Sequence, residues 1–304
     1  MLKKLRIATR ESQLALAQTH LVKEALLKLY PDLAIEIVGI TTEGDKKLDV
    51  SLTKIGGKGL FVKELEQAMH EGKADCAVHS VKDMPMALAY NFRFAAALTR
   101  EDPRDAFISN DFNSIKDLPD NAVVGTSSLR RQCLIKAMRP DLQIKLLRGN
   151  VITRLRKLDE KEYDAIILAA AGLKRLNLES RIKHYFSTDE FIPAAGQGAI
   201  GIECVADENV FSILNKLNDP LTRACITAER AVSRTLNASC QVPLGAFAQY
   251  ENNRIYLRAM LANPENNHLI FASHEGAIEQ AEEIGIQVAN SLLKQGASSI
   301  LDKL

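Results

Sequence analysis

The sequence lacks several features that would at once assign it to a class of protein. No apolar run approaches the roughly 18 residues that a membrane-spanning helix needs. The first residues, MLKKLRIATRES, are basic but no apolar stretch of a secretory signal follows them, so we expect a cytoplasmic protein. An excess of charge of one sign is also missing, because 39 Lys and Arg stand against 38 Asp and Glu, for a net charge of +1. We therefore expect no nucleic-acid partner, and any anion site must be local.

Cysteine and histidine are few and scattered. The five cysteines are at least 15 positions apart, which is typical of neither a disulfide framework nor a zinc knuckle. The six histidines lack a metal-ligand spacing such as H-E-x-x-H. We therefore expect no bound metal, and chemistry from at most one or two thiols. The cysteines are Cys76, Cys133, Cys204, Cys225 and Cys240.

What the sequence does contain is a folded protein of more than one domain. The 304 residues are 46% hydrophobic and 25% charged, and this length suggests two or three domains. In the first hundred residues β-branched runs alternate with apolar residues at helical spacing. A polar segment over 43–59, with four glycines, predicts a mobile surface loop. The expected elements are strands over 5–10, 34–42 and 74–80 and helices over 14–29 and 61–71.

The same alternation begins again at residue 122 and then changes character. It predicts strands over 122–126, 143–148 and 165–171 and helices over 128–138 and 151–161. A strand-like run over 199–205 follows this second unit and is expected to return to the first domain. After Pro220 the pattern indicates a helix to 237, strands over 242–273 with turns at 251–253 and 263–264, and a helix over 277–295. The fold class predicted is α/β, followed by a smaller α+β domain.

Two glycine motifs resemble nucleotide-binding signatures only in their letters. Gly196–Gly201 matches G-x-G-x-x-G, but no strand precedes it and a strand-like run follows where a helix is required. Gly39–Gly44 begins like a phosphate-binding loop, but Asp45 stands where that motif needs lysine. Neither motif indicates a nucleotide enzyme.

Arginine gathers where predicted strands end and the next helices begin. Arg10 with Ser12, the run 126–131, and Arg148 with Arg154 and Arg156 all occupy such turns. Ligands of open α/β sheets bind beyond the carboxyl ends of strands, where helix N-termini and guanidinium groups bind anions. Each arginine alone could be a solvated surface charge. Ser and Thr cluster with the arginines at the same turns, and a helix N-cap explains the hydroxyls but not the cations, so a polyanionic ligand is favoured. Two α/β units with such turns also suggest a cleft between domains as its site.

Two further residues are candidates for chemistry. Asp83 follows a predicted strand beside Lys82, and its carboxylate could stabilise a developing cation or shuttle a proton. It could equally be a turn aspartate ahead of Pro85. Cys240 lies in a loop after a helix, a placement that permits reactivity, whereas burial would make the thiol inert.

Seven blocks of the sequence, in order and over nearly the whole chain, resemble the porphobilinogen deaminase (hydroxymethylbilane synthase) family. The stretch after about residue 248 matches only in general pattern. The blocks are IATRESQLALAQ (7–18), GGKGLFVKELE (56–66), HSVKDMP (79–85), GTSSLRRQ (125–132), RGNVITRLRKLD (148–159), PAAGQGAIGIE (193–203) and CQVPLGA (240–246).

The resemblance implies a transferase of tetrapyrrole (haem) biosynthesis that condenses four porphobilinogen molecules, releases ammonia at each step and hydrolyses off hydroxymethylbilane. It implies a dipyrromethane cofactor bound covalently by a thioether to Cys240, and Asp83 as the catalytic aspartate. Each pyrrole carries an acetate and a propionate, the polyanion that the arginine turns favour. The implied cofactor- and substrate-binding residues are Arg10, Ser12, Lys82, Thr126, Ser128, Arg130, Arg131, Arg148 and Arg154, followed by Arg175, Gln197, Lys54, Lys58 and Phe61.

The resemblance also implies a fold of two α/β domains like periplasmic binding proteins, with a cleft between them, and a smaller C-terminal α+β domain. The expected domains are 1–98 with 199–217, 99–198, and 218–304, in a monomer with no membrane partner. One departure is Ala238-Ser239 before Cys240, where a glycine-rich turn is expected, so the cofactor loop could be stiffer here. The alternative to an enzyme is a two-lobed anion-binding module, which would need the arginines but neither Asp83 nor Cys240.

Overall fold

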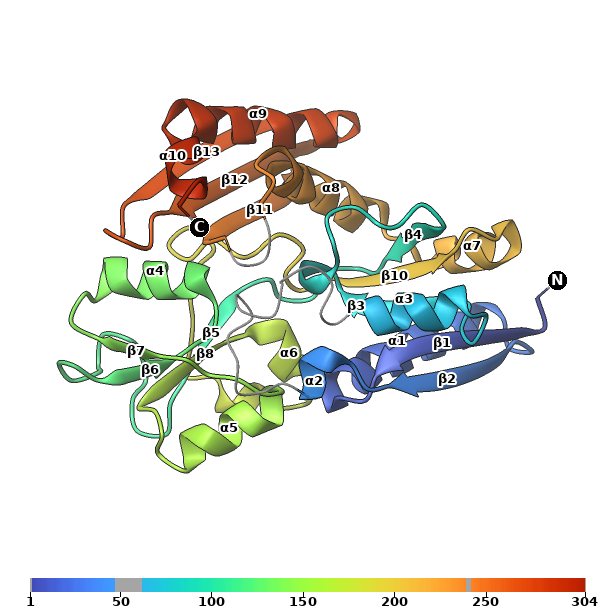
Figure 1. Cartoon of the computed structure of the whole chain (residues 1–304), viewed down its shortest axis with the longest axis horizontal. Helices are drawn as coiled ribbons and strands as arrows, with labels where there is room; N and C mark the ends of the chain where they lie inside the picture. The colour runs from blue at the N-terminus through green and yellow to red at the C-terminus, as the bar shows by residue number, and fades with distance from the viewer. Residues whose placement is uncertain (1, 47–61, 239–241, 304) are drawn as a thin grey trace. The chain divides into compact units, whose positions relative to one another are not determined.

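The computed structural model describes residues 2–46, 62–238 and 242–303 (Figure 1). The chain divides into two compact units, which are described separately below. The first consists of Met1–Glu101 with Ala199–Arg223, and the second of Asp102–Gly198 with Ala224–Leu304.

The first unit is built on a five-stranded mixed sheet. Its strands lie in the order β2 (Ala34–Ile40), β1 (Lys4–Arg10), β3 (Cys76–Ser80), β10 (Ile200–Val205) and β4 (Phe92–Ala97). Strand β1 is parallel to both β2 and β3, whereas β10 is antiparallel to β3 and β4. The strand expected over 199–205 therefore does return to the sheet of the N-terminal segment. The helical elements are α1 (Gln13–Leu29), α2 (Glu43–Lys46), α3 (Lys63–His70), α7 (Glu208–Leu214), η2 (Val81–Asp83) and η4 (Asn215–Leu217).

Strand alternation separates the two faces of this sheet. Leu5 and Ile7 of β1 pack in one apolar cluster with Leu26 of α1. Ala8 of β1 packs in another cluster with Leu65 of α3 and Ala77 of β3. Because successive side chains of a strand point to opposite faces of the sheet, every second residue of β3, counted from Ala77, faces α3.

The second unit contains a further five-stranded sheet. Its order is β7 (Gln143–Lys145), β6 (Val123–Gly125), β8 (Ala165–Ala169), β5 (Asp105–Ile108) and β9 (His184–Tyr185). Strand β6 is parallel to β7 and β8, and β5 is antiparallel to β8 and β9. The helical elements are α4 (Leu129–Met138), α5 (Val151–Asp159), α6 (Ala170–Arg175) and η3 (Glu179–Arg181).

The C-terminal part of the second unit has an antiparallel sheet of three strands, β11 (Leu244–Glu251), β12 (Arg254–Ala262) and β13 (Leu269–Gly276). The β11–β12 turn has positive φ angles of 50° at Asn252 and 60° at Asn253, which a tight hairpin turn requires and asparagine tolerates. The expected turn at 251–253 is thus confirmed. The remaining elements are α8 (Pro220–Thr235), of which the residues up to Arg223 belong to the first unit, η5 (Ile278–Gln280), α9 (Ala281–Lys294) and α10 (Ala297–Leu301).

The predicted α/β class with a C-terminal α+β part is confirmed, and most predicted elements are found within a few residues of their expected bounds. The predicted strand over 165–171 is too long, because Ala170 begins α6. A buried apolar run does not reveal by its period where a strand gives way to a helix. The loop prediction over 43–59 is wrong for residues 43–46, which form α2, and 47–59 lie outside the described residues. The three domain boundaries stay a prediction.

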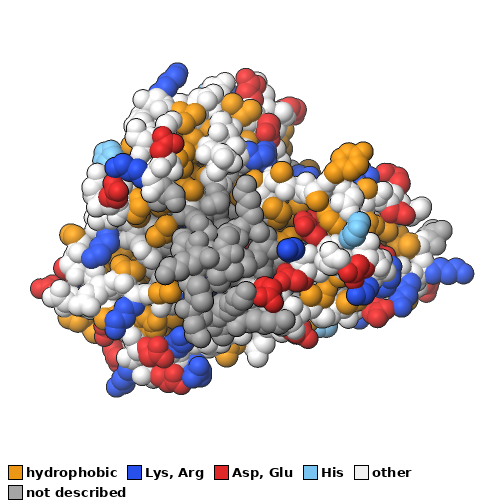
Figure 2. All heavy atoms as spheres, viewed as in Figure 1, with side chains coloured by type: hydrophobic (Ala, Val, Ile, Leu, Met, Phe, Trp, Pro, Cys, Tyr) orange, Lys and Arg blue, Asp and Glu red, His pale blue; other side chains and the backbone are white. Residues whose placement is uncertain are grey.

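The described surface mixes charges of both signs. On the face shown in Figure 2, basic and acidic side chains are interspersed over the described residues, as the near-neutral net charge leads one to expect. Within the described ranges, no helix is both long enough and apolar enough to cross a membrane.

Candidate active site

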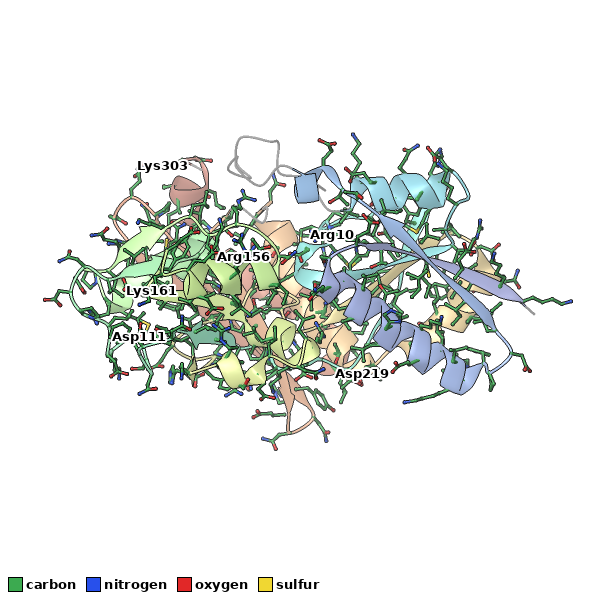
Figure 3. All side chains as sticks on the ribbon, turned by 90° about the horizontal axis from the view of Figure 1, so that it is seen from below. Arg10, Asp111, Arg156, Lys161, Asp219 and Lys303 are labelled. Atoms are coloured by element: carbon green, nitrogen blue, oxygen red, sulfur yellow. The ribbon has the colours of Figure 1, made fainter. Side chains whose placement is uncertain are left out.

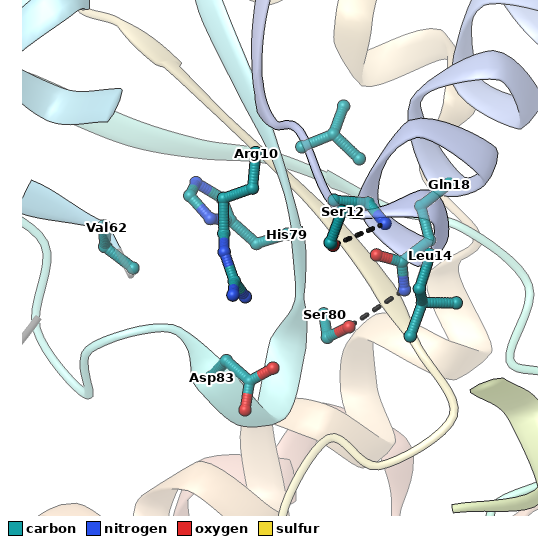
Figure 4. Close-up of a pocket in the computed structure, with 10 residues that line it drawn as sticks. Arg10, Ser12, Leu14, Gln18, Val62, His79, Ser80 and Asp83 are labelled. Atoms are coloured by element: carbon teal, nitrogen blue, oxygen red, sulfur yellow. Dashed lines mark hydrogen bonds between the residues drawn. The ribbon is translucent and has the colours of Figure 1, made fainter. Parts of the chain in front are cut away.

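A small pocket lies at the carboxyl ends of β1 and β3 in the first unit (Figure 4). Since these two strands are parallel, the residues that follow them meet at one edge of the sheet. The pocket has a volume of about 60 Å³. Its lining residues are Arg10, Ser12, Leu14, Ala15, Gln18, Val62, Val78, His79, Ser80 and Asp83.

The wall formed by β1 and α1 is fixed by a helix cap. Arg10 is the last residue of β1 (Figure 3), and α1 begins three residues later. The Ser12 hydroxyl oxygen accepts a hydrogen bond from the backbone N–H of Ala15 at 3.3 Å and so caps the helix. Gln18 Nε2 donates to the Ser80 hydroxyl at 2.9 Å, which ties α1 to the end of β3. The helix N-terminus and the Arg10 guanidinium thereby line the same pocket.

Asp83 enters the pocket from a short helical turn. It is the last residue of η2, and its own side chain is exposed although Val81 and Met84 on either side are buried. The backbone N–H of Val81 donates to the Ala199 carbonyl at 3.0 Å, and that of Met84 to the Val81 carbonyl at 3.1 Å. These contacts hold the turn while the carboxylate of Asp83 and the guanidinium of Arg10 extend into the same space (Figure 4). Lys82, beside Asp83, is half-buried.

A cluster of two glutamates and one histidine lies behind this pocket, and the sequence analysis did not predict it. Buried His79 lines the pocket, and its Nε2 lies 3.1 Å from Oε2 of fully buried Glu203. Burial and the neighbouring Glu203 carboxylate raise the pKa of Glu66 to about 7. A glutamate within the apolar strand pattern IGIECV was the signal that could have indicated it.

In the second unit, two turns with hydroxyl or amide caps also share one sheet edge, because β6 and β7 are parallel. The Ser128 hydroxyl oxygen caps α4 by accepting from the Arg131 N–H at 3.4 Å, and Thr126 Oγ1 accepts from the Ser128 N–H at 3.2 Å. Asn150 caps α5 by accepting from the Thr153 N–H at 2.9 Å. The predicted turn residues thus stand at helix N-termini, where an anion would be stabilised.

Arg130 and Arg131 are held inside the protein by a carboxylate that no sequence pattern indicated. Both side chains are buried, and Asp105, which is fully buried, lies 2.8 Å from Arg130 Nη1 and 2.6 Å from Arg131 Nη2. Burial acts to raise the pKa of Asp105, but the charges of the two guanidinium groups outweigh it and bring the pKa to about 2. Gln197 Nε2 donates to the same carboxylate at 3.1 Å. These groups form one internal network.

Arg148 has a different environment. It is half-buried, burial lowers its pKa, and its Nε is buried without a hydrogen-bond partner among the described residues. Nearby, Arg154 Nε donates to the Gly149 carbonyl at 2.7 Å, in a turn where Gly149 has φ +111°. Arg175 donates to the Gly198 carbonyl at 2.6 Å. A desolvated guanidinium with an unused N–H fits a ligand carboxylate.

Four predicted site residues, Cys240, Lys54, Lys58 and Phe61, lie outside the described residues. The other four cysteines are buried. Burial raises the pKa of the Cys133 thiol to about 11 and that of Cys204 to about 12, and raises that of Cys76 too. These thiols are poor nucleophiles. The described residues contain no group of three or more His, Cys, Asp or Glu that could hold a metal ion.

The fold and these sites define an α/β protein with an exposed carboxylate beside cations and helix N-termini, as an enzyme acting on a polyanionic ligand requires. Two family models match: "Porphobilinogen deaminase, dipyromethane cofactor binding domain" over residues 5–212 and "Porphobilinogen deaminase, C-terminal domain" over residues 223–294. The chain therefore belongs to the porphobilinogen deaminase family, and it is a transferase with hydroxymethylbilane synthase activity and a dipyrromethane cofactor.

Individual relatives are similar in sequence to this chain over almost its full length. Porphobilinogen deaminase of Thiobacillus denitrificans is 53% identical over 301 residues, which cover 99% of this chain and 98% of the relative. That of Laribacter hongkongensis is 52% identical over 302 residues, with the same coverage. Among solved structures, a putative methionine-binding lipoprotein from Bacillus subtilis has 15% identity and a TM-score of 0.46, covering 71% of this chain and 90% of its own.

Proposed function

We propose that Asp83 carries the chemistry by which this chain condenses porphobilinogen units. The observation that supports this assignment is the placement of Asp83, whose exposed carboxylate extends from a buried turn into a pocket shared with Arg10 and the capped start of α1. A carboxylate held in this way needs little reorganisation when positive charge develops next to it.

Each addition breaks the bond between carbon and nitrogen in the aminomethyl group of porphobilinogen. Ammonia leaves, and the methylene-pyrrolenine electrophile that forms carries positive charge on its pyrrole nitrogen. Asp83 would stabilise this charge. A bond between carbons then forms with the end of the growing chain, and the attacked ring loses the proton from its reacting carbon. The aminomethyl group reacts in its ammonium form, so ammonia leaves without taking a further proton. Asp83 would accept the proton of the attacked ring and pass it to the released ammonia, which departs as ammonium, so that the carboxylate is restored for the next round.

Cations and helix N-termini would bind the acetate and propionate groups of the pyrroles. On the first unit these are Arg10, Ser12 and Lys82. On the second, Arg148 supports the proposal most directly, because a carboxylate would satisfy its buried Nε. Thr126, Ser128, Arg130, Arg131, Arg154, Arg175 and Gln197 complete the proposed set in the described residues, with Lys54, Lys58 and Phe61 outside them.

The dipyrromethane cofactor would be held through a thioether to Cys240, and it supplies the primer to which substrate units are added. Support comes from the other cysteines, since all four are buried, and from Arg148, which suits a cofactor carboxylate as well as a substrate one.

We further propose that the protein works as a cytoplasmic monomer, without a metal ion and without a membrane or nucleic-acid partner.

Intact mass tests the attachment. The purified wild type is expected to exceed the mass of its chain by two deaminated porphobilinogen units, and Cys240→Ser is expected to have the bare mass. Cys133→Ser, which changes a buried thiol of the second unit in the same way, should keep the added mass. A bare wild type that also stays bare after incubation with porphobilinogen would favour the two-lobed binding module. Added mass on Cys240→Ser would place the attachment elsewhere.

A further inference from the structure

Three titratable side chains from three elements meet on the α3 face of the first sheet. Strands β3 and β10 are antiparallel, with Gly201 opposite His79 and Glu203 opposite Ala77. Since Ala77 packs against α3, His79 and Glu203 lie on that same face. Helix α3 contributes Glu66, which is half-buried and whose carboxyl group neighbours that of Glu203.

Glu203 cannot be explained as an ordinary core residue. Its side chain is fully buried, and a buried carboxylate is stable only when it is paired or shares a proton. One oxygen, Oε2, lies 3.1 Å from His79 Nε2, and a carboxylate at this position would accept a hydrogen bond from that nitrogen. The other oxygen, Oε1, meets no N–H or O–H donor among the described residues.

A protonated Glu66 would supply the hydrogen-bond donor that Oε1 of Glu203 lacks among the described residues. Two carboxyl groups in contact cannot both ionise at low cost, so such a pair retains one proton between them. The raised pKa of Glu66, about 7, agrees with this interpretation. A glutamic acid O–H that donates to Glu203 would satisfy the buried oxygen.

Other charged groups surround this cluster. Arg6 and Arg10 of β1 share the face of Ala8, and Arg6 is paired with Asp75 at 2.6 Å. On β4, Phe94 stands opposite Glu203, and the Arg223 guanidinium lies 4.0 Å from the centre of the Phe94 ring. Arg10 and His79 both line the Asp83 pocket. Loss of the shared proton would therefore add one negative charge directly behind that pocket.

We propose that Glu66, Glu203 and His79 are positioning residues that set the charge behind the Asp83 pocket by retaining one shared proton. The proposal rests on the proposed function, since the pocket must receive a substrate with two carboxylates. With the proton in place, Glu203 is the one anion of the pair and His79 is held by it. Without the proton, a second carboxylate repels the acetate and propionate of porphobilinogen.

The test compares wild type with Glu66→Gln, whose amide can donate to Glu203 but cannot ionise. For each pH, the kcat/KM of the variant for porphobilinogen is divided by that of the wild type. This quotient is expected to rise by about threefold or more between pH 6 and pH 8, because only the wild type gains the repelling negative charge. Glu71→Gln, at the exposed end of the same helix, should show a constant ratio. A constant ratio for Glu66→Gln would overturn the proposal.

A second measurement uses the protein without substrate. In wild type labelled with ¹³C at the glutamate carboxyl, one resonance should titrate near pH 7, and it should be absent from Glu66→Gln. If every glutamate titrates near its ordinary pKa, the cluster does not share a proton and the proposal is wrong. Failure of the proposed function would instead appear as turnover retained in Asp83→Asn, so the two failures are distinguishable.

Discussion

Asp105 is the internal counter-ion of Arg131: its Oδ1 lies 2.6 Å from Nη2 of the guanidinium, and both side chains are buried. Arg130 contacts the other carboxylate oxygen at 2.8 Å. The two consecutive arginines at the start of α4 therefore have a fixed orientation before any ligand arrives. Preorganisation of this kind reduces the cost of ordering long side chains when a ligand binds.

Asp105→Asn is expected to lower the free energy of unfolding by about 3–5 kcal/mol, because it leaves two buried guanidinium groups without a counter-charge. Denaturant unfolding at pH 7 measures this. Asp111→Asn, at an exposed position (Figure 3), should change stability by less than about 0.5 kcal/mol. Equal losses for the two variants would contradict the role of Asp105.

The same carboxylate predicts a direction of pH dependence. Its folded-state pKa of about 2 is below the ordinary value, so the stabilisation is present at neutral pH and is lost as the pH falls from about 4 towards 2. Wild type should therefore lose stability over this range more steeply than Asp105→Asn. Parallel acid-unfolding curves for the two proteins would show that Asp105 is not the group responsible.

Substitution by methionine should weaken substrate binding at Arg148 and lower stability at Arg139. Arg148→Met removes a desolvated cation that has an unused N–H, so stability should be unchanged or higher, while porphobilinogen binding weakens by about tenfold or more. Arg139 donates to the carbonyls of Ile115 and Leu118 and to Asp141. Arg139→Met should lose about 1–3 kcal/mol of stability and keep substrate affinity. Thermal unfolding and KM report the two effects, and a large stability loss in Arg148→Met would indicate a structural arginine.

Thiol titration offers an independent check on the cofactor linkage. The chain has five cysteines, of which Cys76, Cys133, Cys204 and Cys225 are buried. The native holoprotein should react slowly, because burial suppresses thiolate formation. After denaturation it should show four thiols per chain, since Cys240 is consumed in the thioether. Five reactive thiols in denatured holoprotein would exclude this linkage.

The sequence predicted the strand and helix order well where the period was clear, as in α1 and the hairpin at Asn252. It predicted the turns that carry Arg10, Ser128 and Arg148, because ends of strands and helix caps are local features. It gave no sign that Asp105 would be buried against Arg131, 26 positions away. Strand β5, which carries Asp105, is four residues long and has no hydrophobic alternation to distinguish it.

Long-range pairing also explains the missed cluster at Glu203. His79 and Glu203 are 124 positions apart and meet only because β10 inserts between β3 and β4. A local pattern can identify a charged residue within an apolar strand, but not the partner that makes its burial tolerable. Asp83 and Cys240 were assigned through the family resemblance, and their roles stay predictions.

Whether Asp83 performs the chemistry is decided by the turnover of Asp83→Asn. Asparagine keeps the size of the side chain and one acceptor oxygen but removes the charge that would stabilise the electrophile. In this variant, intact mass should show the cofactor in place while the rate of hydroxymethylbilane formation falls by at least about a hundredfold. Turnover within a few-fold of wild type, with the cofactor attached, would contradict it.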